Sequence, residues 1–354
     1  MKTAVVILNW NTKDYLREYL PALISSTEGM DAEVIVADNA SVDGSPEMLA
    51  TEFPQIRRIS LDDNYGFTGG YNRALAQVEA EYYVLINSDI EVPQNWLKPL
   101  VDWMDTHPEC GACGPKLRSL YDRNAFEYAG AAGGLIDRYG YPFCRGRVMS
   151  MVEKDEGQYD TPADVFWVSG ACLMVRSRLW KELGGLDDRF FAHMEEIDLC
   201  WRIQLAGYRV TVVPESYVYH LGGGTLPNDS PFKLRLNYRN NLLMLENNLA
   251  KAFRARGSSV KGALGKARRR IFVRMLLDGA SAVSYLTTRK WASYQAVVKA
   301  HAEYRKLRRK PAPEEVAAQK ETTIQGWYPR WMVIRALTGR KINLSQPDAC
   351  TLPG

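Results

Sequence analysis

The chain has 354 residues, of which 46% are hydrophobic and 24% charged, and this composition allows one large hydrophobic core with an appendage. It contains no run of roughly 18 or more uncharged apolar residues. Because its first residues lead directly into the apolar stretch 3–8 without a basic region or a cleavage site, we expect neither a membrane span nor a signal peptide.

The basic residues are concentrated in residues 251–310. This segment has 17 lysine and arginine residues against Asp278 and Glu303, a local net charge of +15, so the rest of the chain carries −11 of the total of +4. Apolar residues are interleaved with the basic runs 266–270 and 305–310 at helical spacing, which predicts amphipathic helices. An anionic membrane surface and plain solvation of a helix face explain this charge about equally well. Nucleic-acid binding ranks below both, because residues 1–250 contain no motif of that kind.

The cysteines mostly lie in apolar, strand-like stretches, which predicts buried free thiols in a reducing, cytoplasmic compartment. Two of them form a CxxC pair, but no second ligand pair follows, so we interpret it as part of the core and not as a zinc site. The six cysteines are Cys110, Cys113, Cys144, Cys172, Cys200 and Cys350.

Apolar stretches alternate with amphipathic ones through the first quarter of the chain, a pattern typical of an α/β protein with a mostly parallel sheet. The expected strands are 4–8, 33–37, 56–61 and 82–86, and the expected helices are 14–25 and 69–78.

Polar residues follow these strands, at 9–11, 38–43, 64 and 87–89. Each group alone is explained by turns and helix caps. However, ligands bind beyond the carboxyl ends of parallel strands, and four successive strand ends carry asparagine or aspartate. The glycine-rich stretch 64–72 opens a helix and is typical of an anion-binding helix N-terminus, although it matches no established phosphate motif.

The second half predicts paired strand segments around Gly170, in the stretch 167–176, followed by a helix whose first turn carries three acids, Glu195, Glu196 and Asp198. Negative charge there stabilises the helix dipole, which is one explanation of the acids. The other is catalysis, since transfer to a neutral hydroxyl needs a carboxylate base.

Four segments, 6–11, 36–45, 64–72 and 85–92, occur in an order that resembles the nucleotide-sugar half of glycosyltransferase family 2, especially its rhamnosyltransferase-like members. The resemblance extends over roughly residues 3–245. It implies the GT-A fold, which is Rossmann-like with a mostly parallel central sheet, together with a nucleoside diphosphate-sugar donor and inversion at the anomeric carbon.

By position, the resemblance assigns Asp38 to the pyrimidine base and Asn9 and Asn11 to the nucleotide pocket. Asp89 stands at the last acid of the family's metal-binding DxD motif, whereas Asn87 replaces an acid and weakens the expected metal affinity. The expected donor-binding residues are Asn9, Asn11, Asp38, Asn39, Ser41, Asp43, Asn64, Gly66, Gly69, Asn72, Asn87, Ser88 and Asp89.

The resemblance also implies the catalytic residues, because the second acid of the family's "ED" motif is the base. That match makes Glu196 the base and Glu195 a partner of the acceptor hydroxyl, with Asp198 structural or positioning the acceptor. His220 matches a histidine that completes the metal site in several GT-A enzymes, so Asp89 and His220 are expected to hold Mg²⁺ or Mn²⁺. The expected acceptor-binding residues are Trp167, Gly170 and Glu195.

The expected function is therefore inverting, non-processive sugar transfer, with dTDP-rhamnose as the first guess and other dTDP- or UDP-sugars open. The acceptor is expected to be a glycan linked to polyprenyl diphosphate, met at the cytoplasmic face of the membrane by a peripheral protein. A catalytically degenerate GT-A scaffold remains the alternative. A nucleotidyltransferase is less favoured, because 9–13 lacks the glycines of its phosphate loop.

The expected domains are a catalytic domain at 1–230 and a basic, mostly helical extension at 231–354. The catalytic domain divides into a nucleotide-sugar half, about 1–115, and an acceptor half, about 116–230. The pattern at 232–246 predicts the first helix of the extension.

Overall fold

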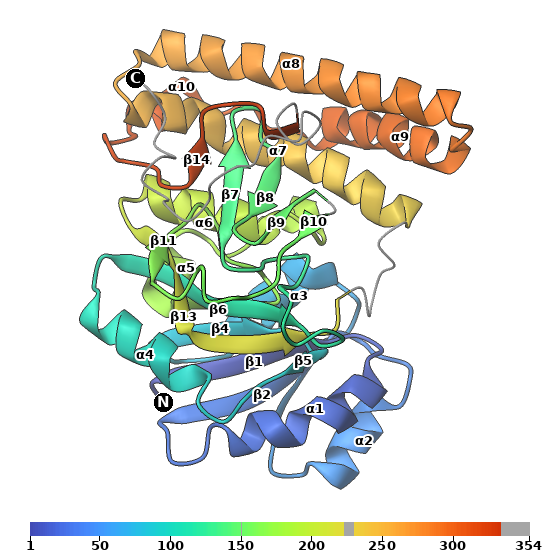
Figure 1. Cartoon of the computed structure of the whole chain (residues 1–354), viewed down its shortest axis with the longest axis vertical. Helices are drawn as coiled ribbons and strands as arrows, with labels where there is room; N and C mark the ends of the chain where they lie inside the picture. Colours follow the sequence, from blue (N-terminus) through green and yellow to red (C-terminus); the bar gives the residue numbers. More distant parts are fainter. Residues whose placement is uncertain (150, 223–229, 334–354) are drawn as a thin grey trace.

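The computed structural model shows an α/β protein in stacked layers, with helices, a large sheet, a small sheet and a final layer of long helices (Figure 1). The structure describes residues 1–149, 151–222 and 230–333.

The large central sheet has nine strands. They are β1 (Thr3–Asn9), β2 (Ala32–Asp38), β3 (Arg57–Ser60), β4 (Tyr82–Ile86), β5 (Ile90–Glu91), β6 (Cys110–Ser119), β11 (Ala163–Asp164), β12 (Cys172–Arg176) and β13 (Arg209–His220). Their order is β11-β13-β6-β12-β4-β1-β2-β3, with β5 beside β13. The strands β3, β2, β1 and β4 are parallel, β12 is antiparallel to β4 and β6, and β13 is parallel to β6. The carboxyl ends of β1 to β4 therefore lie along one edge.

Helices cover both faces of this sheet, and each face has its own hydrophobic core. The helices α1 (Lys13–Ser25), α2 (Ser45–Glu52) and α4 (Leu97–Thr106) pack on one face. On the other face lie α3 (Gly66–Leu75), α5 (Ser177–Glu182) and α6 (Glu195–Leu205). In α1 the buried residues Leu16, Leu20 and Leu23 recur at helical spacing, which is why this helix presents one apolar face to the sheet.

A small second sheet has the order β10-β9-β8-β7-β14. Its strands are β7 (Gly134–Asp137), β8 (Pro142–Cys144), β9 (Arg147–Val148), β10 (Met151–Val152) and β14 (Trp327–Tyr328). The last of these comes from the far end of the chain and pairs in parallel with β7. Trp327 is 1% exposed and packs edge-on against Phe166 and Trp201. The C-terminal extension thus contributes to the same core as the catalytic half.

Long helices form the outer layer, shown at the top of Figure 1. They are α7 (Pro231–Ala255), α8 (Val260–Thr287) and α9 (Trp291–Leu307), with the short α10 (Pro313–Ala317) beside them. α7 packs against α6 on one side and against α8 and α9 on the other. This layer is built mostly from the basic segment, whose predicted helices are confirmed.

The strands predicted in the first 90 residues are confirmed within one or two residues. The helix predicted at 69–78 is α3, which begins at Gly66, three residues earlier than expected, and α2 was not predicted. The expected strand pair around Gly170 is wrong. Only Cys172–Arg176 forms a strand, and it pairs with β4 and β6, while Trp167 makes a single bridge to Gly134. The hydrophobic stretch before Gly170 is buried as irregular chain.

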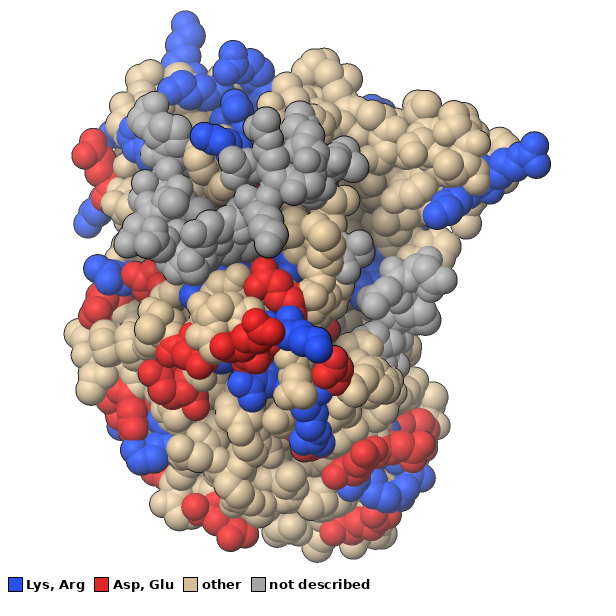
Figure 2. Space-filling model, viewed as in Figure 1, with Lys and Arg blue, Asp and Glu red and all other residues tan. Residues whose placement is uncertain are grey.

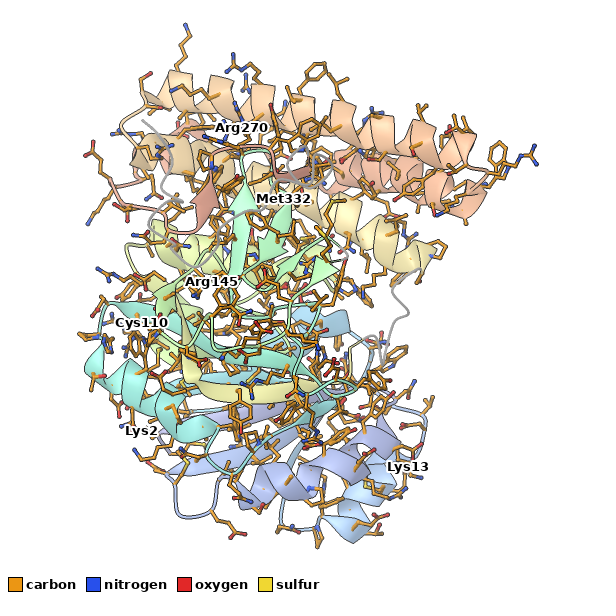
Figure 3. The ribbon with its side chains drawn as sticks, in the orientation of Figure 1. Lys2, Lys13, Cys110, Arg145, Arg270 and Met332 are labelled. Carbon is orange, nitrogen blue, oxygen red and sulfur yellow. The ribbon has the colours of Figure 1, made fainter. Side chains whose placement is uncertain are left out.

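Five cysteines are buried and free, as predicted, and Cys350 lies outside the described residues. Cys110 begins β6 inside the core (Figure 3), and burial raises its pKa to about 11. Among the described helices, none combines the length and apolar character needed to cross a membrane.

Candidate active site

The ends of β1 and β2 bring two of the predicted donor residues, Asn9 and Asp38, into contact. The two strands are in register, so Asn9 lies directly beside Asp38. The Asn9 amide donates to Asp38 Oδ1 over 2.7 Å and to Ser41 Oγ over 3.0 Å. Both side chains are buried, and the bond between them fixes the carboxyl ends of β1 and β2 relative to each other.

The turn after β1 is tied to the turn after β2. Asn11, at φ 55°, accepts from the Val42 amide over 2.8 Å. Asp43 accepts from the amides of Lys13 and Ser45, which begin α1 and α2. Burial works against ionisation of Asp43, but these hydrogen bonds outweigh it and lower its pKa. Asp43 therefore caps two helices, which is a structural role.

The loop before α3 closes over the same edge. Asn39 donates to Asn64 Oδ1 and to the Gly66 carbonyl, and Asn64 Oδ1 accepts from the Gly66 amide. Gly66 has φ +67°, and a β-carbon there would collide with the ring of Phe191. Only glycine permits this approach of α3 to the segment that precedes α6.

Asn72, another predicted donor residue, instead joins the two halves of the site. Its side chain donates to the Leu186 carbonyl and to Asp188 Oδ1, and accepts from the Leu186 amide. Gly69, one turn earlier, packs closely on Tyr65. The contacts of both residues serve the packing of α3.

Asp89, His220 and Glu127 form a buried acid–histidine–acid cluster. His220 Nε2 lies 3.3 Å from Asp89 Oδ1, and Nδ1 lies 3.5 Å from Glu127 Oε2. Burial lowers the pKa of His220, but the hydrogen bonds and charges of the two acids outweigh it and raise the pKa to about 10. The pairing β13 with β5 brings His220 next to the Asp89 loop.

This cluster fits a divalent cation in its chemistry. Among the described residues, no group of three histidine, cysteine or acidic side chains is already placed to hold a metal. However, neighbouring ligands of an octahedral Mg²⁺ lie about 3 Å apart, close to the separation of the Asp89 and His220 atoms. A bound cation would have to displace the Nε2 proton that the raised pKa of His220 otherwise keeps on the ring, so metal binding would release a proton. Glu127 lies beside the other ring nitrogen, with its Oε2 3.5 Å from Nδ1.

The segment around Gly170 joins the donor loop to the acidic helix. The half-buried Asn87 donates its backbone amide to the Ala171 carbonyl over 2.9 Å, and the buried Ser88 follows in that loop. A β-carbon at Gly170 would lie 3.4 Å from the Glu196 Cβ and 3.7 Å from the Phe67 ring of α3. Elements of both halves thus meet at Gly170.

The chain preceding α6 is held in an unusual conformation. Phe191 has φ 63° and ψ −59°, and the Ala192 amide donates to the Phe190 carbonyl over 2.7 Å, which defines a tight γ-turn. His193 and Met194 also have positive φ, at 69° and 72°. Non-glycine residues in these conformations cost free energy and persist only when neighbours hold them.

α7 supplies that restraint. The buried Asn240 amide lies 2.7–2.9 Å from the carbonyl oxygens of Phe190, Ala192 and His193. Arg239 donates to the Phe190 carbonyl as well. The extension therefore fixes the position of the acidic helix.

The two glutamates at the start of α6 have free, buried carboxyl oxygens. Glu195 Oε2 and Glu196 Oε2 are buried without a hydrogen-bond partner in the described structure. Burial raises the pKa of Glu196 to about 7. Burial, and then the neighbouring Glu196, raise the pKa of Glu195 well above its ordinary value. A carboxyl that titrates near neutrality is suited to accept a proton.

Two other predicted residues have structural contacts. Asp198 is 0% exposed and accepts from Arg202, Asn247 and Asn248, so it joins α6 to α7. Trp167 is 3% exposed, and its indole nitrogen donates to the Leu135 carbonyl. The sequence did not single out Glu127, because it lies in a stretch without recognisable pattern and reaches His220 only through folding.

An α/β sheet whose polar strand ends meet a buried acidic helix is an arrangement that fits a GT-A glycosyltransferase. The chain belongs to glycosyltransferase family 2, since residues 4–184, about half of the chain, match the sequence profile described as Glycosyl transferase family 2.

Two curated relatives are rhamnosyltransferases. The N-acetylglucosaminyl-diphospho-decaprenol L-rhamnosyltransferase of Mycobacterium tuberculosis is 26% identical over 294 residues, 75% of this chain and 95% of the relative. Rhamnosyltransferase WbbL of Escherichia coli is 25% identical over 231 residues, 61% of this chain and 82% of the relative.

Solved structures share the fold at low sequence identity. GalNAc-T7 with UDP, GalNAc and Mn²⁺ has a TM-score of 0.54 at 17% identity, over 70% of this chain and 48% of its own. The mannosyltransferase PcManGT from Pyrobaculum calidifontis, with GDP-Man and Mn²⁺, has a TM-score of 0.51 at 17% identity, over 85% and 86%.

Proposed function

We propose that this glycosyltransferase moves one sugar per encounter, with inversion, from a nucleoside diphosphate to a hydroxyl of a lipid-linked saccharide. The observation that carries the proposal is the buried Glu196 Oε2, which has no hydrogen-bond partner among the described residues and lies on the side chain that meets Gly170, where the donor loop joins α6. Burial raises the pKa of this carboxyl to about 7.

In the proposed reaction Glu196 accepts the proton of the acceptor hydroxyl. The hydroxyl oxygen forms a bond to the anomeric carbon while the bond from that carbon to the diphosphate oxygen breaks, and the nucleoside diphosphate departs with the electron pair. Attack from the face opposite the leaving group inverts the anomeric centre. Glu195, whose pKa is raised above its ordinary value by burial and by the neighbouring Glu196, is the partner of the acceptor hydroxyl.

Asp89 and His220 would hold a divalent cation, Mg²⁺ or Mn²⁺. When bound, such an ion offsets negative charge on the departing diphosphate. Asn9, Asp38 and Asn39 shape the nucleotide pocket through the bonds described above.

The relatives support the substrate classes. Both named relatives are rhamnosyltransferases, and the name of the mycobacterial enzyme specifies a diphospho-decaprenol acceptor. We propose dTDP-rhamnose as the donor, a polyprenyl-diphosphate saccharide as the acceptor, and the cytoplasmic face of the membrane as the place of reaction.

A donor panel tests the proposal. Purified protein with Mg²⁺ or Mn²⁺ is given UDP-, dTDP- and GDP-sugars together with membrane-extracted acceptor lipids, and nucleotide release is measured. We expect release from one donor, with kcat reduced about 100-fold or more in Glu196→Gln.

The matched control is Glu215→Gln, which changes an exposed glutamate of β13 and should retain full activity. If Glu196→Gln retained full activity, Glu196 would be excluded as the base. Donor binding without release, even with acceptor lipids, would favour the degenerate scaffold.

A further inference from the structure

One face of α8 exposes a continuous row of apolar side chains. Phe272, Leu276 and Val283 are 61%, 58% and 58% exposed, and Leu286 is 38% exposed. Together with the exposed Gly279, these residues recur every three or four positions. They therefore lie along one side of the helix for about 21 Å. We call these five residues the α8 stripe.

Basic residues lie at both ends of this stripe. Arg268 and Arg269 are exposed just before it, and Arg289 and Lys290 are exposed just after it, beside Trp291, which is 59% exposed. Figure 2 shows lysine and arginine gathered at the two ends of the helical layer, with uncharged residues between them.

The exposed surface of α8 carries no acid. Its single acidic residue, Asp278, is 0% exposed and is bonded to Arg274 and His301 on the buried side. Arg270 also faces inward, under α8 (Figure 3), where it lies over the rings of Phe253 and Trp327. Lys266 donates to Ser258 Oγ and lies over the Phe253 ring. Arg268 and Arg269 are therefore the two arginines of the run 266–270 that face outward toward an external anion.

We infer that the α8 stripe docks the protein on an anionic phospholipid surface, with α8 lying in the plane of the membrane. Apolar side chains enter the headgroup boundary, while flanking arginine and lysine residues contact lipid phosphates. A second copy of the chain fits less well, because antiparallel pairing of two α8 helices would place basic end against basic end.

This inference rests on the proposed function and extends it. A lipid-linked acceptor is confined to the membrane surface, so an enzyme docked there would meet it. The turn between α8 and α9 projects beyond the sheet on the side where α7 begins (Figure 1). α7 in turn holds the segment before Glu196. Docking through α8 therefore keeps the catalytic helix at a fixed height above the lipid.

The test is co-sedimentation of the full chain with vesicles of phosphatidylcholine, with and without phosphatidylglycerol. We expect binding to the anionic vesicles that weakens at high salt. Phe272→Ser with Leu276→Ser, and separately Arg268→Glu with Arg269→Glu, should each weaken binding about tenfold or more. Matched controls are Tyr121→Ser, at a side chain 80% exposed, and Arg178→Glu on α5.

Transfer to a detergent-solubilised acceptor should be equal in all these proteins, so its failure in the unaltered chain would count against the proposed function alone. Unchanged vesicle binding in both pairs of variants, or no binding by the unaltered chain, would overturn the inference. So would sedimentation velocity showing that the Phe272 and Leu276 substitutions dissociate a dimer without affecting vesicle binding.

Discussion

Glu196 is suited to act as a base because burial raises the pKa of its carboxyl. Its neighbours Glu195 and Asp198 are acidic, and His193, whose pKa burial lowers to about 4, is neutral at pH 7. With its own pKa near 7, Glu196 must lose its proton before it can act as a base. We expect kcat/KM to rise about tenfold per pH unit up to about pH 7 and then to level. A profile flat from about pH 5 to about pH 8, measured at saturating Mg²⁺, would contradict this assignment.

The same burial carries a cost in stability. The ordinary pKa of a glutamate is 4.5, and that of Glu196 is raised to about 7, so ionisation destabilises the fold increasingly between these values and fully above the higher one. Glu196→Gln should therefore increase the free energy of unfolding by about 1–3 kcal/mol at pH 8, and much less near pH 4.5. Thermal melting at both pH values measures the difference. An equal effect at both would mean that the glutamine acts through packing.

At the scale of elements, the γ-turn before α6 depends on α7. Asn240→Ala removes the donor to the carbonyls of Phe190, Ala192 and His193. We expect it to destabilise the protein by about 1–3 kcal/mol and also to lower kcat about tenfold or more, since the base is displaced.

Asn241→Ala is the matched control for that substitution. Asn241 is the next residue of α7, is equally buried, and donates to the Gly140 carbonyl, away from the turn. It should destabilise the protein similarly while leaving kcat nearly unchanged. Equal losses of kcat in the two variants would show that Asn240 has no specific positioning role.

The sequence predicted the regular elements well where a periodic pattern extends over a whole element, as in β1, α1 and α7. It failed around Gly170, because a buried apolar stretch reads as strand whether or not a partner strand is available. The site was predicted as a set of polar strand ends, and Asn9, Asp38 and Asn39 do meet. Asn72 and Asp43 could not be separated from them, since asparagine and aspartate serve turns, caps and ligands alike. Glu127 was missed because its contact with His220 is formed only by the fold.

At the scale of the whole molecule, the boundary between the catalytic domain and the extension at residue 231 stays a prediction. The hydrophobic core contains residues from both sides of this boundary. Trp327→Ala should lower the free energy of unfolding by about 3–5 kcal/mol. The catalytic half and the extension should still unfold in one transition, observed by circular dichroism and by loss of nucleotide-sugar binding. Trp291→Ala, at an exposed indole, is the control and should cost less than about 0.5 kcal/mol. Two separate transitions would show that the extension folds on its own.

The pairing of β14 with β7 has a consequence for synthesis of the protein. The Met332 amide donates to Asp137, 195 positions earlier in the chain. A ribosome delivers β7 long before β14, so the small sheet lacks its edge strand, and Phe166 and Trp201 lack Trp327, until residues 327–328 have been synthesised. The small sheet is thus completed late in synthesis, and a chain terminated before residue 327 should expose this aromatic cluster to chaperones and proteases.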